Sequence, residues 1–357
     1  MATISLCMIV KNEEELLARC LDSVKQVVDE IIIVDTGSTD QTKEIAKRYT
    51  DKIYDFEWIN DFSAARNFSY EKATMDYQMW LDADDVLPEE SLQALIKLKP
   101  KLLKNDVEIV TMKYVTHFDE HDIPTVISVR ERLTRRDKSF SWLDPIHECI
   151  PIAGRLYTSD IVVHHRPIHK EERTERNINI LREIEKSDTV LTPRQQYYFA
   201  RELQGQEDYP KAIYYFEKFL DSGEGYAEDN IASCFHKALC YKALNDEDKI
   251  IPSLLKSFEY DTPRAEVCSE IGYFYKNKKQ YELALKWFDH AIQLKKPEVS
   301  SFLLCDFWGY IPNIEACVCA GELGDYEKAT AYNEAAATYK PLAPAVQQNR
   351  EFLASFA

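Results

Sequence analysis

The sequence predicts an open α/β domain in the first half of the chain and an all-α domain of repeated helix pairs in the second. In the first third, short apolar runs alternate with stretches whose apolar residues recur at helical spacing. After about residue 192 the spacing is helical throughout, and an order of small, aromatic and proline residues returns about every 34 residues. We therefore expect a first domain at 1–170, a helical linker at 171–191 and a second domain at 192–357.

Four apolar runs of the first domain have the character of buried strands, because strand-forming residues follow one another without alternation. They lie at 4–10, 30–35, 52–56 and 77–80. Helices are expected between and after them, at 13–24, 39–49, 62–73 and 88–98. This pattern predicts a parallel sheet covered on both faces, which binds ligands beyond the carboxyl ends of its strands. Further strands are expected at 107–118, 126–136 and 160–167, followed by a charged helix at 171–187.

The composition supports a folded protein and excludes several classes of function. The 357 residues are 45% hydrophobic, which is enough for a full core. A net charge of −17 argues against binding to nucleic acid and to anionic lipid. An anionic substrate would need a local positive group, such as a metal ion, to offset the repulsion. The 9 glycines are few for a glycine-rich nucleotide loop or for an all-β protein.

The cysteines and the start of the chain indicate a cytoplasmic protein. None of the 9 cysteines falls in a Cys-x-x-Cys pair and their number is odd, so we expect buried free thiols in a reducing compartment. The first residues lack the basic start of a signal peptide. No window approaches the ~18 apolar residues of a membrane span. We therefore expect a soluble protein with no membrane span.

An acidic cluster follows the fourth expected strand, where the chain reads WLDADD from Trp80 to Asp85. Carboxylates this close repel one another unless a positive group lies between them. Asp82 and Asp84 are separated by one residue, a spacing that in a turn after a strand aims both at one point. A divalent cation such as Mg²⁺ or Mn²⁺ prefers oxygen ligands of this kind and in turn holds phosphates. The simpler alternative is that Asp84 or Asp85 caps the helix beginning at Pro88, which explains one carboxylate but not three.

Three other stretches accompany the acidic cluster: IVKNEE at 9–14, VDTGSTD at 34–40 and DFSAARN at 61–67. Each is weak alone, since VDTGSTD is also the pattern of an ordinary capped turn. In this order and spacing, the four stretches together resemble the family 2 glycosyltransferases, which have the GT-A nucleotide-sugar fold. The resemblance covers roughly the first half of the chain.

The resemblance implies roles at the nucleoside end of a donor substrate. Asp35 would accept a hydrogen bond from the base of the nucleotide, and the backbone around Val10 and Asn12 would flank that base. Glu13 or Glu14 would reach the ribose or the edge of the ring.

The resemblance also implies roles at the diphosphate. Arg66 would balance its negative charge or hold the carboxylate of Asp35. Asp82 would contact the ribose and a metal ion, Asp84 would be the direct metal ligand, and Ala83 between them belongs to the same nucleotide-binding turn.

A later stretch, WLDPIHE at 142–148, extends the resemblance, because several family members carry a His-Glu pair there. His147 would be a third metal ligand or a donor to the diphosphate. Glu148 is the candidate catalytic base, with Asp144 as the second choice. His164 also matches a position where relatives carry His, and His165 lies beside it, although a His on a strand is ordinarily a packed or surface residue.

The reaction implied by the resemblance is an inverting, metal-dependent transfer of a hexose from a UDP-sugar. In a single displacement at the anomeric carbon, the metal would neutralise the charge that grows on the leaving diphosphate. One carboxylate would take the proton of the attacking acceptor group.

The second domain has the pattern of tetratricopeptide repeats. Ala200, Gly272 and Cys317 are each followed twelve residues later by an alanine, and a fainter copy lies around Ala238. Small residues let the two helices of a pair approach closely, and aromatic residues fill the groove beside them. The last step exceeds one period, so we expect an insertion near 300–312.

Such repeats form a groove suited to an extended peptide or a partner helix, which suggests a peptide or protein acceptor held near the transferase. The combined plan resembles the sublancin-type peptide glycosyltransferases, which modify Cys and in some relatives Ser or Thr. A homodimer through the repeats is an equally good use of them. Two alternatives remain: a transferase acting on a cell-envelope glycan or lipopolysaccharide core, and a non-catalytic repeat scaffold.

Overall fold

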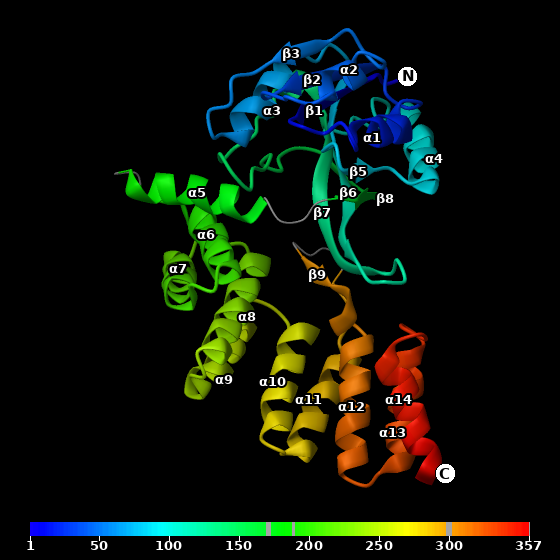
Figure 1. The fold of residues 1–357 in the computed structure, drawn as a ribbon, viewed down its shortest axis with the longest axis vertical. Helices are drawn as coiled ribbons and strands as arrows, with labels where there is room; N and C mark the ends of the chain where they lie inside the picture. The colour runs from blue at the N-terminus through cyan, green and yellow to red at the C-terminus, as the bar shows by residue number, and fades with distance from the viewer. Residues whose placement is uncertain (169–172, 188–189, 298–301, 357) are drawn as a thin grey trace. The chain divides into compact units, whose positions relative to one another are not determined.

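The computed structural model describes residues 1–168, 173–187, 190–297 and 302–356. The chain divides into two compact units, Met1–Val190 and Leu191–Ala357 (Figure 1). The helix expected as a linker, α5 (Arg173–Lys186), belongs to the first unit. All 9 cysteines lie in the described residues and none forms a disulfide; most of them are buried, as expected. Within the described ranges, no helix has the length and apolar character needed to span a bilayer.

A mixed sheet forms the centre of the first unit, with the strand order β3-β2-β1-β4-β7-β6-β8-β5. Its parallel part consists of the four strands that the apolar runs predict: β1 (Ile4–Val10), β2 (Glu30–Asp35), β3 (Ile53–Asp55) and β4 (Tyr77–Trp80). The ends of β1 and β2 match the predicted runs residue for residue. The carboxyl ends of these strands therefore lie along one edge of the sheet, as the sequence predicts.

The sheet becomes mixed beyond β4. The long strand β7 (Pro124–Arg135) runs antiparallel to β4 and to β6 (Ile109–Phe118). Strand β8 (Leu156–His165) runs parallel to β6 and antiparallel to the short strand β5 (Asp85–Val86). Because β5 directly follows the acidic turn, its pairing with β8 brings the end of β8 to that turn.

The helices of the first unit are α1 (Leu17–Val24), α2 (Thr42–Ala46), α3 (Phe62–Glu71) and α4 (Glu89–Leu98), followed by α5. Helices α1 and α2 begin later than their spacing predicts, because the residues before them form two loops that bond to each other. Helix α3 begins at the predicted residue, Phe62, because the side chain of Asp61 accepts a hydrogen bond from the backbone N–H of Ala64.

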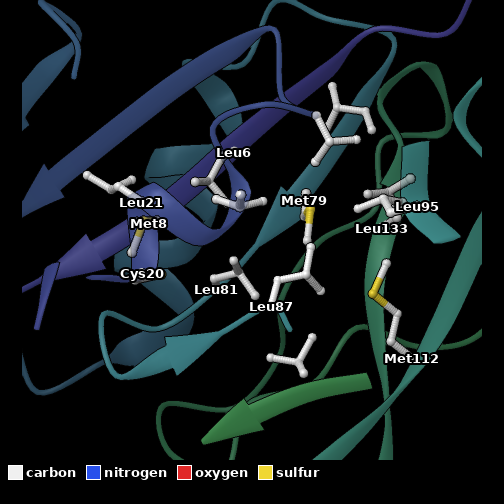
Figure 2. Close-up of a cluster of buried hydrophobic side chains, with 14 of the residues drawn as sticks. Leu6, Met8, Cys20, Leu21, Met79, Leu81, Leu87, Leu95, Met112 and Leu133 are labelled. Atoms are coloured by element: carbon white, nitrogen blue, oxygen red, sulfur yellow. The ribbon is translucent and has the colours of Figure 1, made fainter. Parts of the chain in front are cut away.

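Each face of the sheet has its own core, since successive side chains of a strand point to opposite faces. Leu6 of β1 lies on the face covered by α1 and α4, in the cluster with Leu95 that Figure 2 shows. Cys7 lies on the other face, with Tyr70 of α3 and with Trp142. The second face of the sheet therefore packs against the two segments that contain the candidate site residues, DFSAARN and WLDPIHE.

The second unit consists of consecutive antiparallel helix pairs and a final helix (Figure 1). The pairs are α6 (Pro193–Gly205) with α7 (Tyr209–Ser222), α8 (Ala227–Ala243) with α9 (Glu247–Lys256), α10 (Ala265–Asn277) with α11 (Tyr281–Gln293), and α12 (Tyr310–Glu322) with α13 (Tyr326–Ala337); α14 (Pro344–Leu353) follows. Each of the four repeats expected from the sequence corresponds to one pair.

The insertion expected near 300–312 falls partly outside the described residues, which exclude 298–301. Its described part contains a two-residue strand, β9 (Leu303–Leu304), and a short 3-10 turn at Cys305–Phe307, before α12 begins at Tyr310.

The small residues of the repeats allow close packing within a pair. Gly272 of α10 faces the ring of Phe288 on α11, and a Cβ atom placed on Gly272 would lie 2.7 Å from that ring. Phe288 and Ala284 are fully buried. The glycine therefore marks a contact where no side chain fits.

We expect Gly272→Ala to destabilise the second unit by about 1–3 kcal/mol, because the added methyl group overpacks the Phe288 contact. Gly321→Ala is the matched control, since Gly321 is also in a helix but has no atom within 4 Å of the added Cβ. That control should be neutral or stabilising by up to about 1 kcal/mol. Urea unfolding of both variants measures the difference; equal effects would contradict the packing argument.

Candidate active site

A cleft of about 780 Å³ opens beyond the carboxyl ends of β1 and β4. Most of the candidate site residues line it: Val10, Asn12, Glu14, Arg66, Asp82, Ala83, Asp84, His147 and Glu148. Asp35 and Asp144 are not among the described residues that line it, although Thr36, next to Asp35, is. The structure thus gathers residues from four separate stretches of sequence around one hollow.

The loops after β1 and β2 bind each other through reciprocal hydrogen bonds. The backbone N–H of Asn12 donates to the Ser38 hydroxyl (2.9 Å), and the Asn12 side chain accepts from the N–H of Thr39 (2.8 Å). The Glu14 N–H donates to Asp40 (3.1 Å), and the Glu14 carboxylate accepts from the N–H of Gln41 (2.8 Å). The side chains of Asn12 and Glu14 therefore hold the neighbouring loop in place, a use that the sequence does not reveal.

Asp35 lies buried at the end of β2, and its two carboxylate oxygens differ in their surroundings. Oδ2 accepts from the backbone N–H groups of Gly37 (3.1 Å) and Ser38 (3.0 Å), with Lys43 Nζ 3.7 Å away. Oδ1 is enclosed and has no hydrogen-bond partner among the described residues. A buried carboxylate oxygen without a donor is costly, so this atom is suited to receive an N–H from a ligand.

The three acids of the WLDADD turn have three different surroundings. Asp82 is partly exposed and binds Arg66 at 2.8 Å. Desolvation opposes ionisation of Asp82, but the guanidinium groups of Arg66 and Arg132 stabilise its charge, and its pKa is lowered. Asp85 is fully buried; its Oδ2 accepts from Arg132 (2.8 Å) and from the backbone N–H of Asp82 (3.0 Å). Two of the three carboxylates are therefore balanced by arginines of the protein itself.

The third acid, Asp84, is buried beside His165 of β8, with 3.3 Å between its Oδ1 and His165 Nδ1. Burial alone would lower the pKa of His165, but hydrogen bonds to Asp84 and Asp85 and their charges raise it to about 9. The alternative that these acids cap α4 is wrong, since Pro88 is the N-cap residue and no side chain caps it. The next residue back along β8, His164, pairs with Phe118 instead.

Asp84, Asp85 and His165 are suited to a metal ion. Each offers one ligand atom, and these three atoms lie within 4.8 Å of one another. Two carboxylates and an imidazole are ligands that Mn²⁺ accepts. Since the charge of Asp85 is already balanced by Arg132, Asp84 and His165 are the stronger candidates. His147 lines the same cleft but is not part of this cluster of described residues.

Three separate contacts join helix α3 to the segment 142–148. The Asn67 side chain donates to the Trp142 carbonyl (3.0 Å) and accepts from the Trp142 N–H (2.8 Å). The Phe62 N–H donates to the Pro145 carbonyl (2.9 Å). Arg66 provides the third contact, with Glu148. The motifs DFSAARN and WLDPIHE, about 75 residues apart in sequence, are thus two parts of one structure.

Arg66 lies at the centre of the contacts between α3 and the segment 142–148. Its guanidinium is buried between the rings of Trp80 and Trp142, at 4.7 and 4.9 Å from their centroids. Nε donates to Glu148 (2.7 Å) and Nη2 to Asp82 (2.8 Å). Burial alone would lower the pKa of Arg66, but the two carboxylates raise it, so the side chain stays charged. The guanidinium of Arg66 therefore binds Asp82 and Glu148 at the same time, through two different nitrogen atoms.

Comparison with known proteins identifies the families that the two halves of the chain resemble. The model of glycosyl transferase family 2 matches residues 5–162, and a tetratricopeptide repeat model matches residues 265–297. The N-terminal domain belongs to glycosyl transferase family 2. The fold of the chain, a GT-A domain followed by a helical repeat region, is the one that the sequence predicts.

Three named relatives illustrate the range of similar proteins. The SPbeta prophage-derived glycosyltransferase SunS of Bacillus subtilis is 27% identical over 284 residues, covering 76% of this chain and 65% of SunS. A TPR repeat-containing protein of Synechococcus elongatus is 50% identical over 102 residues, covering 29% and 25%. The lipopolysaccharide core biosynthesis glycosyltransferase LpsC of Rhizobium meliloti is 28% identical over 186 residues, covering 48% and 66%. The chain thus spans a quarter to two thirds of the length of these relatives.

Several residues of the family 2 domain's cleft are not among the sequence-based candidates. Arg132 and Asn67 act on the site through the side chains and backbone they hold, and Trp58, Phe62 and Arg176 line the cleft directly. Among these residues, Asn67 could have been predicted from the sequence, because it directly follows Arg66 in the DFSAARN stretch. Asp144 remains the second candidate for the base; its backbone has a positive φ of 70°.

Proposed function

We propose that the family 2 domain is an inverting, metal-dependent glycosyltransferase that moves a hexose from a UDP-sugar to an acceptor. The observation that carries this proposal is the position of Arg66, which joins Asp82, next to the candidate metal ligand Asp84, to Glu148. A candidate donor-binding carboxylate, Asp82, and a candidate base, Glu148, thus bind the same guanidinium in one cleft. UDP as the nucleotide follows from the resemblance to the family.

The donor would occupy the part of the cleft formed by the loops after β1, β2 and β4. The unpartnered oxygen of Asp35 would accept the N–H of the uracil ring, beside the backbone of Val10. Asp84 and His165, with Asp82 or Asp85, would hold Mg²⁺ or Mn²⁺; when bound, such an ion stabilises the negative charge of the leaving diphosphate.

The chemical step needs one base on the acceptor side. Glu148 would take the proton of the acceptor hydroxyl or thiol as its oxygen or sulfur forms a bond to the anomeric carbon. The bond from that carbon to the phosphate oxygen breaks, and the electron pair leaves with UDP. Arg66 holds Glu148 through Nε, and Arg130 donates to the Glu148 backbone carbonyl (3.2 Å), so the carboxylate is held in place. Asp144 is the second candidate for this role.

The acceptor is proposed to be a peptide or protein side chain, Cys, Ser or Thr. The support for this class is the similarity to SunS over most of the chain and the repeat unit that follows the domain. The similarity to LpsC supports a second candidate, an envelope glycan or lipopolysaccharide core acceptor. The repeats would hold the acceptor or join two copies of the chain.

We test the function by incubating the full chain with a panel of UDP-, GDP- and dTDP-sugars, with Mn²⁺, Mg²⁺ or EDTA, and measuring release of nucleoside diphosphate. Release from one UDP-sugar with metal and not with EDTA is expected. Absence of both release and binding across the panel, measured by calorimetry, would refute the transferase and leave the scaffold function.

We expect Glu148→Gln to keep UDP binding and to lose turnover by about 10²–10⁴-fold, the usual contribution of a general base. Gln keeps the size of the side chain and a hydrogen-bond acceptor for Arg66, so the site should remain folded. Calorimetric titration with UDP and the initial rate of transfer measure the two effects. Unchanged turnover would move the assignment to Asp144, for which Asp144→Asn is the corresponding variant.

A further inference from the structure

The lining of the cleft includes aromatic and apolar side chains as well as the acids near Asp84. Trp58 and Phe62 meet edge to face with their ring centroids 4.7 Å apart, and both line the cleft together with Ile146. We call these three residues the aromatic wall. The hydrogen bond from the Phe62 N–H to the Pro145 carbonyl fixes the wall to the segment that carries Glu148.

Two residues of the aromatic wall, Phe62 and Ile146, belong to the segments that hold the proposed base. Phe62 is one helical turn before Arg66 on α3, and Arg66 binds both Glu148 and Asp82. Ile146 is two residues before Glu148 in the segment that contacts this helix. A group bound at the wall would therefore be a close neighbour of the atom that loses its proton to Glu148.

The chemistry of the aromatic wall favours an apolar side chain. Arg176 of α5 lies over Phe62, 4.7 Å from its centroid, so part of the ring face is covered and less is free for stacking a sugar ring. The carboxylates that line the cleft come instead mainly from the loops after β1, β2 and β4. Arg176 disfavours a basic group at the wall, and the nearby carboxylate of Glu148 disfavours an acidic one.

We propose that the aromatic wall binds an apolar side chain that neighbours the modified residue of a polypeptide acceptor. The wall would thus set the sequence preference of transfer, an inference that rests on the peptide acceptor of the proposed function. Burial of such a side chain against the wall adds binding energy without altering the bond that breaks, so the preference should appear in KM and in affinity.

The probes are blocked heptapeptides with a central Cys or Ser and a neighbouring Leu, Phe, Ala, Asp or Lys. Affinity is measured by calorimetry in the presence of UDP and Mn²⁺, and transfer by mass spectrometry. The Leu and Phe peptides should bind the full chain about tenfold more tightly than the Ala, Asp and Lys peptides, which corresponds to ~1.4 kcal/mol. KM should follow the same order, with kcat changed by less than about threefold.

Trp58→Ala and Phe62→Leu should each remove most of this preference while the affinity for UDP stays within about threefold of the original. Ile59→Ala is the matched control, because Ile59 is the exposed neighbour of Trp58 and does not line the cleft. The Ile59→Ala variant should keep the preference for peptides with a neighbouring Leu or Phe.

Three results would overturn the proposal: peptides that bind equally whatever the neighbour, a preference that survives both wall variants, or transfer only to glycans. Calorimetry keeps the test independent of turnover. If no nucleotide sugar is bound or hydrolysed, the proposed function fails; if donor hydrolysis persists without a neighbour preference, the wall proposal alone fails.

Discussion

Replacing Asp84 by Asn is expected to reduce sugar transfer by 10³-fold or more, since an ion that supplies several kcal/mol of charge stabilisation corresponds to roughly this factor. Asp84 is buried beside His165, and Asn has nearly the same shape, so the loss would come from the missing charge. EDTA should have a similar effect on the unmodified chain, and Mn²⁺ should reverse it. Initial rates with and without metal, and the affinity for Mn²⁺ by calorimetry, measure both.

Asp160→Asn is the control for this prediction. Asp160 is on the same strand as His165 but is exposed, and its carboxylate binds Lys113. This control should keep full transfer and full metal affinity. Transfer by Asp84→Asn at a rate near that of the unmodified chain, in the presence of EDTA, would show that the cleft does not use a metal at this position.

Replacing Arg132 by Met should destabilise the first unit by about 3–5 kcal/mol, because it removes the buried guanidinium that balances the charge of the buried Asp85 carboxylate. Arg132 and Asp85 are both fully buried, and Arg132 also lies 3.7 Å from the Trp80 ring centroid and 4.3 Å from that of Tyr114. Since Asp85 also accepts from the Asp82 N–H, the acidic turn should loosen and metal affinity should fall. Urea unfolding and calorimetry measure the two effects.

Arg135→Met provides the comparison on the same strand. Arg135 binds the exposed acids Asp106 and Asp137, and pairs of this kind contribute about 0–1 kcal/mol. The double variant Arg132→Met with Asp85→Leu should recover part of the lost stability, since it removes both buried charges. If Arg132→Met unfolds at the same urea concentration as Arg135→Met, the buried pair does not stabilise the domain as argued.

The parallel half of the sheet could be predicted from sequence because each strand is buried on both faces. Such strands are apolar at most positions, so the runs at 4–10 and 30–35 show where these strands begin and end. The mixed half could not be derived in the same way. Strand β7 contains buried polar residues such as Arg132 and Thr134, and its pairing with β4 depends on residues about 55 positions apart.

The contiguous parts of the candidate site could also be predicted, since WLDADD and DFSAARN each carry their chemistry in a few adjacent positions. The partners of these residues could not. His165 reaches Asp84 only because β5 pairs with β8, and Arg132 reaches Asp85 from the middle of β7. The crowding of acids in the sequence suggested one positive group, a metal ion, whereas the fold supplies two arginines as well.

The three contacts between α3 and the segment 142–148 have a practical consequence for protein engineering. In a chimera that takes WLDPIHE from a related transferase but keeps its own α3, the contacts that position the candidate base Glu148 would be mismatched. Both segments would have to be grafted together. The tip of the β6–β7 hairpin, by contrast, contacts Arg166 through Asp122 and Phe118.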